Sequence, residues 1–195
     1  MLKEILFPVL AYFLGSISFA HIIASAKGVS LRETGSGNLG TANVFTNVGK
    51  IYGVMVCICD MLKAIVPMFF LKIMGGANFS VAITGLCAII GHDFPVYYKF
   101  RGGKGFSTAL GVIGFLSPIT LCIAGFGAVI TIFFTHYPTL GFLSFLVLTP
   151  ISFIILGTDL ATISIVCVVI LFLLARTIPN FKLFFSGGER TIWVK

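Results

Sequence analysis

The chain has 195 residues, of which 58% are hydrophobic and only 10% are charged, and its formal net charge is +7. Soluble globular chains carry about a quarter charged residues, so this composition excludes a disordered tail, a nucleic-acid-binding module and a cytosolic enzyme. We therefore expect an integral membrane protein that binds no nucleic acid. The excess of Lys and Arg is typical of cytoplasmic loops, or of a face that binds anionic lipid or an anionic substrate.

Apolar runs divide the chain into seven segments, which predict an all-α integral membrane protein built as a seven-helix transmembrane bundle. The first run, Ile5–Ala26, is long enough to supply the roughly 20 residues with which a helix crosses hydrocarbon. Ala24-Ser25-Ala26 imitates a signal-peptidase site, but the run exceeds the about 7 to 15 residues of a secretory core, so we expect a retained helix. The later segments are Ile51–Met74, Phe79–Gly91, Ala109–Ser117, Ile119–Thr135, Thr139–Leu156 and Leu160–Ala175.

The fourth segment is too short to cross a bilayer alone, and Ser117-Pro118 ends it. Because proline interrupts a helix, we expect the fourth and fifth segments to be a bent or partly re-entrant pair in the middle of the bundle. No linker or low-complexity stretch divides the chain, so residues 1–195 are expected to form a single transmembrane domain.

The cations predict the orientation of the chain. Lys and Arg accumulate in loops that stay in the cytoplasm, and most of the 13 here gather on one side if the N-terminus is outside. They are Lys27, Arg32 and Lys50 in the first loop (residues 27–50), Lys99, Arg101 and Lys104 in the second loop (residues 91–108), and Arg176, Lys182, Arg190 and Lys195 in the tail. We therefore expect the polar chemistry on the cytoplasmic face.

The first loop contains the sequence G-S-G-N-L-G-T-A-N-V over residues 35–44, which formally includes G-x-G-x-x-G. A dinucleotide-binding fingerprint follows a strand in a soluble βαβ unit, and this one follows a membrane helix, so we reject that interpretation. Glycines with positive φ let backbone N–H groups converge on an anion, and polar side chains add donors. The alternative is a tight, solvated turn between two helices.

The second loop reads G-H-D-F-P-V-Y-Y-K-F-R-G-G-K-G-F-S-T over residues 91–108. Glycines around Lys104 allow close backbone approach to a phosphate, and Ser107 and Thr108 are candidate caps for the next helix, whose N-terminus favours negative charge. It is not a Walker A motif, because the early glycine is missing and Gly105 follows the lysine. The alternative is that Arg101 and Lys104 anchor the loop to anionic lipid headgroups.

Other candidate groups carry weaker signals. Asp60 and Lys63 are three residues apart on the second helix, where charges are costly, and a structural pair is the simpler interpretation. No histidine belongs to an H-x-x-x-x-D acyltransferase signature, and no G-x-S-x-G elbow occurs. His92 beside Asp93 could act as a base or form a local hydrogen-bonded cap. The five cysteines lie in apolar runs without metal-ligand spacing, so no disulfide, metal or cofactor is expected.

Together, these two loops resemble the bacterial PlsY family of acyl-phosphate-dependent glycerol-3-phosphate acyltransferases. The resemblance extends through the Asp60/Lys63 pair, the Y-x-x-L-G segment at residues 137–141, and the tail with Asn180 and Glu189. It implies a seven-helix bundle in the bacterial inner membrane, which transfers a fatty acyl group from acyl phosphate to the 1-hydroxyl of glycerol 3-phosphate and makes lysophosphatidic acid. The partners implied are these two substrates and membrane lipid, and we expect a monomer.

The resemblance also implies site residues. The chemistry would be substrate-assisted, because the leaving phosphate can accept the hydroxyl proton while the protein positions two anions. Catalytic roles would fall to Ser36, Asn38, His92 and Lys104. Substrate contacts would come from Gly37, Thr41, Asn43, Gly102, Gly103, Gly105, Ser107, Thr108, Thr139 and Asn180.

Three departures from the family pattern bear on activity. Thr46 stands where the family has an arginine, Thr177 and Leu183 replace a histidine and a basic residue, and Pro138-Thr139 replaces a serine pair. Each lost charge-assisted bond would be worth roughly 1.5 to 3 kcal/mol, so the acceptor could bind more weakly or differ. The alternatives are an inactive or altered-specificity paralogue, or a small anion transporter whose broken helices face an anion.

Overall fold

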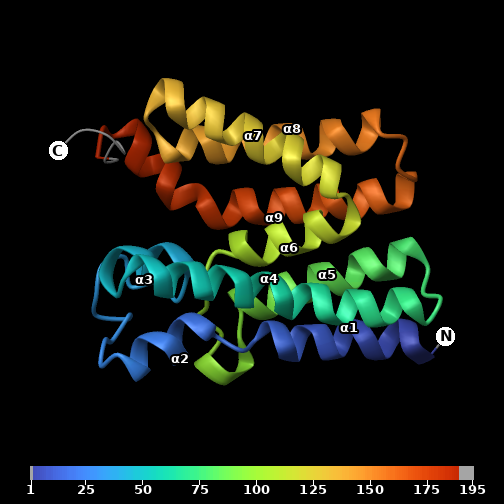
Figure 1. The fold of residues 1–195 in the computed structure, drawn as a ribbon, viewed down its shortest axis with the longest axis horizontal. Helices are drawn as coiled ribbons and strands as arrows, with labels where there is room; N and C mark the ends of the chain where they lie inside the picture. The colour runs from blue at the N-terminus through green and yellow to red at the C-terminus, as the bar shows by residue number, and fades with distance from the viewer. Residues whose placement is uncertain (1, 189–195) are drawn as a thin grey trace. The chain divides into compact units, whose positions relative to one another are not determined.

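The structure is a computed structural model that describes residues 2–188, in which all regular secondary structure is helical (Figure 1). The helices are α1 (Leu2–Gly15), α2 (Phe19–Ala26), α3 (Thr41–Asn47), α4 (Lys50–Ile73), α5 (Asn78–Asp93), the 3₁₀ turn η1 (Val96–Tyr98), α6 (Phe106–Leu116), α7 (Pro118–Thr135), α8 (Pro138–Ile155) and α9 (Leu160–Phe185). Six helical segments of this part are long and apolar enough to cross a membrane, and α6 is a shorter apolar helix. The predicted seven-segment membrane fold is therefore confirmed.

Internal contacts divide the chain into two compact units, Met1–Phe115 and Leu116–Lys195. Each unit is described by itself, and the expected single domain stays a prediction. The predicted tail residues Glu189, Arg190 and Lys195 lie outside the described residues.

The first predicted span is interrupted in the first unit. α1 ends at Gly15 and α2 begins at Phe19. The Ser18 side chain accepts a hydrogen bond from the backbone N–H of His21 at 3.2 Å, and such a cap competes with continuation of the preceding helix. The break releases the carbonyl of Ile17, which accepts a bond from Lys63 Nζ at 3.0 Å. An uninterrupted helix would have used that carbonyl itself.

Small residues let α1 and α5 pack closely. A Cβ on Gly15 would overlap the Ala88 carbonyl, and one on Gly91 would overlap the Tyr12 carbonyl. Close backbone approach through small residues is the usual basis of helix association in membranes, where apolar burial alone gives no preference. The Tyr12 hydroxyl adds a bond of 3.0 Å to the carbonyl of Phe94. This packing fixes the end of α5 from which the second loop starts.

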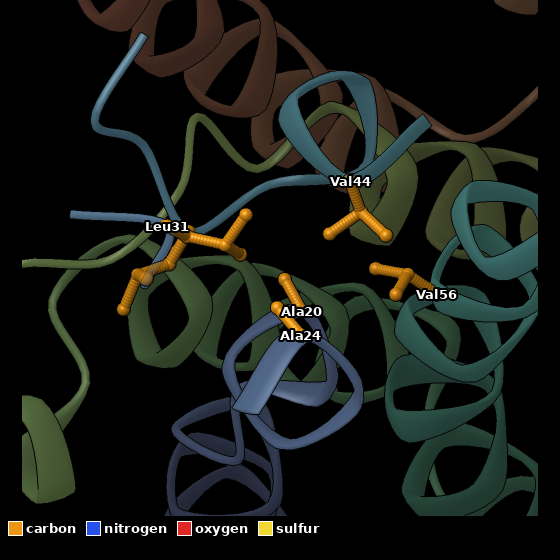
Figure 2. Close-up of a cluster of buried hydrophobic side chains, with 6 residues drawn as sticks. Ala20, Ala24, Leu31, Val44 and Val56 are labelled. Atoms are coloured by element: carbon orange, nitrogen blue, oxygen red, sulfur yellow. The ribbon is translucent and has the colours of Figure 1, made fainter. Parts of the chain in front are cut away.

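The first loop folds onto the helices rather than extending away from them. Residues 41–47, near the end of this loop, form the short helix α3, which was not predicted from the sequence. Figure 2 shows Val44 of α3 and Leu31 of the loop pointing toward Ala20 and Ala24 of α2 and Val56 of α4. Each of these side chains is at most 2% exposed. Burial of a Leu side chain is worth about 1.5 to 3 kcal/mol, so this cluster holds the loop in place.

α6 completes the first unit. Its 11 residues, at about 1.5 Å per residue, are too short for the roughly 30 Å of hydrocarbon. It lies against α4 and α5, since a Cβ on Gly111 would come within 2.6 Å of the Met61 carbonyl and one on Gly85 within 2.7 Å of Val112. Helix α6 ends before Ser117-Pro118 as predicted, and the bent pair with α7 stays a prediction.

The second unit consists of α7, α8 and α9. Ser117 caps α7 through a bond of 3.2 Å from the Thr120 N–H, and Asp159 caps α9 through a bond of 2.9 Å from the Thr162 N–H. α9 continues to Phe185, ten residues past the predicted end at Ala175. Arg176 and Asn180 therefore lie on a helix and not in an irregular tail, because Pro179 does not end this helix.

Candidate active site

The two polar loops meet in the first unit. The hydroxyls of Thr41 and Ser107 are 2.7 Å apart, which joins the start of α3 to the start of α6. The Arg32 guanidinium donates a hydrogen bond to the carbonyl of Arg101. The Leu39 carbonyl lies beside Gly103, within 3.0 Å of where a Cβ on that glycine would be. The structure therefore brings both glycine-rich loops into one site.

Asn43 organises the first loop. Its side-chain amide nitrogen shares its hydrogens among three backbone carbonyls, and its amide oxygen accepts a weak bond of 3.4 Å from the Ser36 N–H. The three carbonyls belong to Leu31, Thr34 and Asn38, at 3.2, 3.0 and 3.0 Å. The residue is only 4% exposed. Asn43 thus positions the loop, and direct contact between its side chain and substrate stays a prediction.

The glycines of this loop are required by its turns. Gly35 and Gly37 have φ of +62° and +70°, which only glycine adopts without strain. A Cβ on Gly35 would overlap the Asn43 amide oxygen. Ser36 is exposed and Asn38 is partly exposed, so these two side chains remain at the surface of the site. Their predicted catalytic roles are compatible with this placement.

The second loop is held by its backbone. The N–H groups of Gly102 and Gly103 donate to the carbonyls of Asp93 and His92 at 3.1 and 3.2 Å. A Cβ on Gly102 would overlap the His92 carbonyl, and one on Gly103 would overlap His92 Nε2. Gly105 has φ of +74° and lies against Ile89 and Asp93 of α5. The loop can follow α5 this closely because these positions lack side chains.

Helix α6 begins at Phe106, so Ser107 and Thr108 lie in its first turn and the expectation that they cap it is wrong. Both are buried, at 8% and 0% exposed. The first N–H groups of a helix have no partner within the helix and carry positive partial charge. Lys104 lies half-buried two residues before this helix start. This arrangement of one cation and a helix N-terminus suits a phosphate.

Asp60 and Lys63 extend the site into the bundle. Their side chains form an ion pair of 2.8 Å and are 1% and 3% exposed. Lys63 Nζ is also 2.8 Å from Nδ1 of His92, and Nδ1 lies 3.6 Å from the Asp60 carboxylate. The sequence analysis interpreted the pair as structural and did not connect it to the site. The available signal was the rarity of charges inside a membrane helix.

The other predicted residues belong to the second unit. Thr139 is buried in the first turn of α8, and Asn180 is partly exposed on α9. Whether they contact substrate stays a prediction. The Thr177 hydroxyl donates to the Leu173 carbonyl at 2.8 Å, so this side chain is used within its own helix.

Thr46 and Leu183 are exposed, and neither supplies a cation. The five cysteines are free thiols. No group of three or more His, Cys, Asp or Glu side chains that could hold a metal occurs within residues 2–188.

Comparison with known proteins gives one family match and several relatives, some of which match nearly the whole chain. The profile of the family described as glycerol-3-phosphate acyltransferase matches residues 5–187. A glycerol-3-phosphate acyltransferase of Aquifex aeolicus is 45% identical over 118 residues, which are 60% of this chain and 62% of that protein. Those of Thermotoga petrophila and Halalkalibacterium halodurans are 33% and 36% identical, over 96% and 93% of this chain and 95% and 92% of theirs.

Solved structures agree with the sequence matches. The crystal structure of PlsY, an integral membrane glycerol 3-phosphate acyltransferase, in its glycerol 3-phosphate form has a TM-score of 0.92 at 31% identity, covering 97% of this chain and 95% of that one. Its lysophosphatidic acid form has a TM-score of 0.90 at 30% identity, with 96% and 94% covered. The chain therefore belongs to the glycerol-3-phosphate acyltransferase family.

Proposed function

We propose that this protein transfers a fatty acyl group from acyl phosphate to the 1-hydroxyl of glycerol 3-phosphate and releases lysophosphatidic acid and inorganic phosphate. The observation that carries the proposal is the meeting of the two loops at Gly103 and at the Thr41–Ser107 contact of 2.7 Å. Membership of the family and the similarity to PlsY in glycerol 3-phosphate and lysophosphatidic acid forms support the choice of acceptor and product.

The reaction needs little acid–base chemistry from the protein. The hydroxyl oxygen attacks the acyl carbonyl, the bond from that carbon to the phosphate oxygen breaks, and the departing phosphate takes the hydroxyl proton. The protein then has to align two anions and stabilise the charge on the carbonyl oxygen. Lys104 and the N-terminus of α6 supply positive charge for this, while Ser36 and Asn38 supply polar contacts from the first loop.

We also propose that both loops face the cytoplasm of a bacterial cell. The cations Lys27, Arg32 and Lys50 of the first loop and Lys99 and Arg101 of the second support this orientation. Reporter fusions after Lys99 and after Gly75 test it. Cytoplasmic signal at Lys99 and external signal at Gly75 are expected, and the reverse pattern would overturn the orientation.

The activity is tested with purified protein in lipid nanodiscs. Acyl phosphate and glycerol 3-phosphate are supplied, phosphate release is measured, and lysophosphatidic acid is detected by mass spectrometry. Lys104→Gln should lower kcat/KM by about 30-fold, since a charge-assisted bond is worth roughly 2 kcal/mol. Lys99→Gln is the matched control, because Lys99 is an exposed lysine of the same loop.

Several outcomes would contradict the proposal. Equal changes in kcat/KM for the two lysine substitutions would show that Lys104 has no specific role in the site. Transfer from acyl-coenzyme A but not from acyl phosphate would change the donor. Transfer to an acceptor other than glycerol 3-phosphate would agree with Thr46, Thr177 and Leu183, which bring no cation to the positions where the family has basic residues.

A further inference from the structure

We propose that Lys63 is a positioning residue that holds His92 as the neutral tautomer protonated on Nε2, so that His92 gives a hydrogen bond to a substrate oxygen and does not act as a base. The role of His92 in catalysis rests on the proposed acyl transfer, whereas the tautomer of His92 does not. It starts from the buried cluster of Asp60, Lys63 and His92, whose side chains are 1%, 3% and 6% exposed.

The lysine has three polar neighbours, of which the Ile17 carbonyl and His92 Nδ1 are hydrogen-bonding partners and Asp60 is an ion-pair partner. Its Nζ atom lies 2.8 Å from the Asp60 carboxylate, 3.0 Å from the Ile17 carbonyl and 2.8 Å from His92 Nδ1. Ammonium donates and never accepts. Nδ1 must therefore be the unprotonated, accepting nitrogen, and the ring proton of a neutral imidazole then lies on Nε2.

In the alternative protonation state, His92 carries protons on both ring nitrogens and is charged, and Lys63 is a neutral amine. In water an amine holds its proton about 10⁴-fold more tightly than an imidazole. The Asp60 carboxylate also favours the positive charge on Lys63 over a positive charge on His92, because it is 2.8 Å from Lys63 Nζ but 3.6 Å from His92 Nδ1. With Lys63 charged and His92 neutral, the charges of Asp60 and Lys63 cancel, and the buried Asp93 carboxylate also attracts the Lys63 ammonium.

The break between α1 and α2 also helps to position Lys63. The Ile17 carbonyl is available to Lys63 because α1 ends at Gly15 and Ser18 starts α2. The ammonium is thus held from two sides while its third hydrogen points to the imidazole. Fixing a lysine side chain costs about 2 kcal/mol of rotamer entropy, and the contacts with Asp60 and the Ile17 carbonyl offset this cost.

The other ring nitrogen faces the place where the loops meet. A Cβ on Gly103 would overlap His92 Nε2 and would come within 3.0 Å of the Leu39 carbonyl. Because Gly103 has no side chain, Nε2 and the Leu39 carbonyl can approach the same point of the second loop. A neutral N–H at this position stabilises negative charge on a phosphate or acyl oxygen without having to release a proton.

The tautomer is measured by NMR on protein with ¹⁵N-labelled histidine in nanodiscs without substrate. Signals of His92 are identified by their loss in His92→Gln. We expect an acceptor-type shift for Nδ1 and an N–H-type shift for Nε2. N–H-type shifts for both nitrogens, or an N–H on Nδ1, would overturn the proposal. This readout needs no activity, so a failure of the acyl-transfer hypothesis is seen separately as absent turnover by the unsubstituted protein.

A matched pair of double variants tests the consequence. Asp60→Asn with Lys63→Gln keeps an N–H donor in an uncharged pair, whereas Asp60→Asn with Lys63→Met has similar size and no donor. Both remove the ion pair, so their effects on folding should be similar in thermal unfolding. We expect kcat of the Met variant to be at least 10-fold below that of the Gln variant, with similar KM, and a loss of the pure Nε2–H signal only in the Met variant. Equal kcat values and identical His92 spectra would show that the donor has no role.

Discussion

The two loops reach the same site by different means. The polar groups of the first loop are organised by the side chain of Asn43, whose amide nitrogen contacts three backbone carbonyls. The second loop is held by backbone bonds from Gly102 and Gly103 to the end of α5 and by the absence of side chains at these positions. Both loops need glycines, but a buried amide satisfies the backbone carbonyls of the first loop, whereas glycine N–H groups pair with the end of α5 in the second loop.

The difference follows from where each loop begins. The last carbonyls of a helix have no partner within the helix. The second loop turns straight back onto α5, so the N–H groups of Gly102 and Gly103 can pair with the carbonyls of Asp93 and His92. The first loop instead wraps around its own turns before α3, and a side chain from inside the loop has to satisfy the carbonyls.

The largest effect is expected from Asn43→Asp. The substitution keeps size but replaces the donor by a carboxylate that faces the carbonyls of Leu31, Thr34 and Asn38. Each buried group left without a partner costs about 1 to 3 kcal/mol, so stability should fall by roughly 3 to 5 kcal/mol. Thermal unfolding in detergent measures this, and hydrogen exchange should report faster exchange throughout residues 27–50.

Asn47→Asp is the matched control for this change. The Asn47 side chain lies on the same short helix and donates to the Asn43 amide oxygen at 2.8 Å, but it is exposed. Loss of an exposed bond should cost about 1 kcal/mol or less. Equal destabilisation by the two substitutions would show that Asn43 does not organise the loop.

The sequence was sufficient for the membrane segments and insufficient for their interruptions. The length of the apolar runs alone predicted the long helices, because a run of about 20 apolar residues is typical of a transmembrane helix. The break after Gly15 depends on a cap at Ser18 and on Lys63, which lies 46 residues from Ile17 in the sequence, and no local pattern reveals this contact. The short helix α3 was missed because it is stabilised by packing against α2 and α4, which its own sequence does not reveal.

The candidate site was predictable at the level of its loops. Glycines, cations and polar side chains indicated that both loops carry the polar chemistry on one face, and the structure brings them together at Thr41 and Ser107. The role of Asn43 could not be predicted, since the partners of an amide depend on the path of the turn. The link from Lys63 to His92 could not be predicted either, because it joins two helices at a register that only packing determines.

An intermediate effect is expected from Gly102→Ala in the second loop. The new Cβ would overlap the His92 carbonyl and would lie 2.7 Å from Pro95 Cδ. Because the obstacle is backbone, we expect the upper end of overpacking costs, about 3 kcal/mol, and at least a 10-fold loss of acyl transfer. Gly40→Ala is the control from the first loop, where nothing lies within 4 Å of the added Cβ. It should change stability by no more than about 1 kcal/mol, and a cost as large as that of Gly102→Ala would contradict the contrast between the loops.

The smallest effect concerns the contact that joins the loops. Thr41→Val and Ser107→Ala each remove one hydroxyl of the 2.7 Å pair. The Ser107 hydroxyl also bonds to the Cys57 side chain, so Ser107→Ala alone would overstate the link between the loops. A double-mutant cycle isolates that link, and we expect a coupling of about 1 kcal/mol in the free energy of unfolding. If the two effects add, the loops are held only by their separate supports, Asn43 on one side and the end of α5 on the other. If they couple, the hydroxyl pair sets the distance between the loops. The double variant should then raise KM for the phosphorylated acceptor by more than its loss of stability explains.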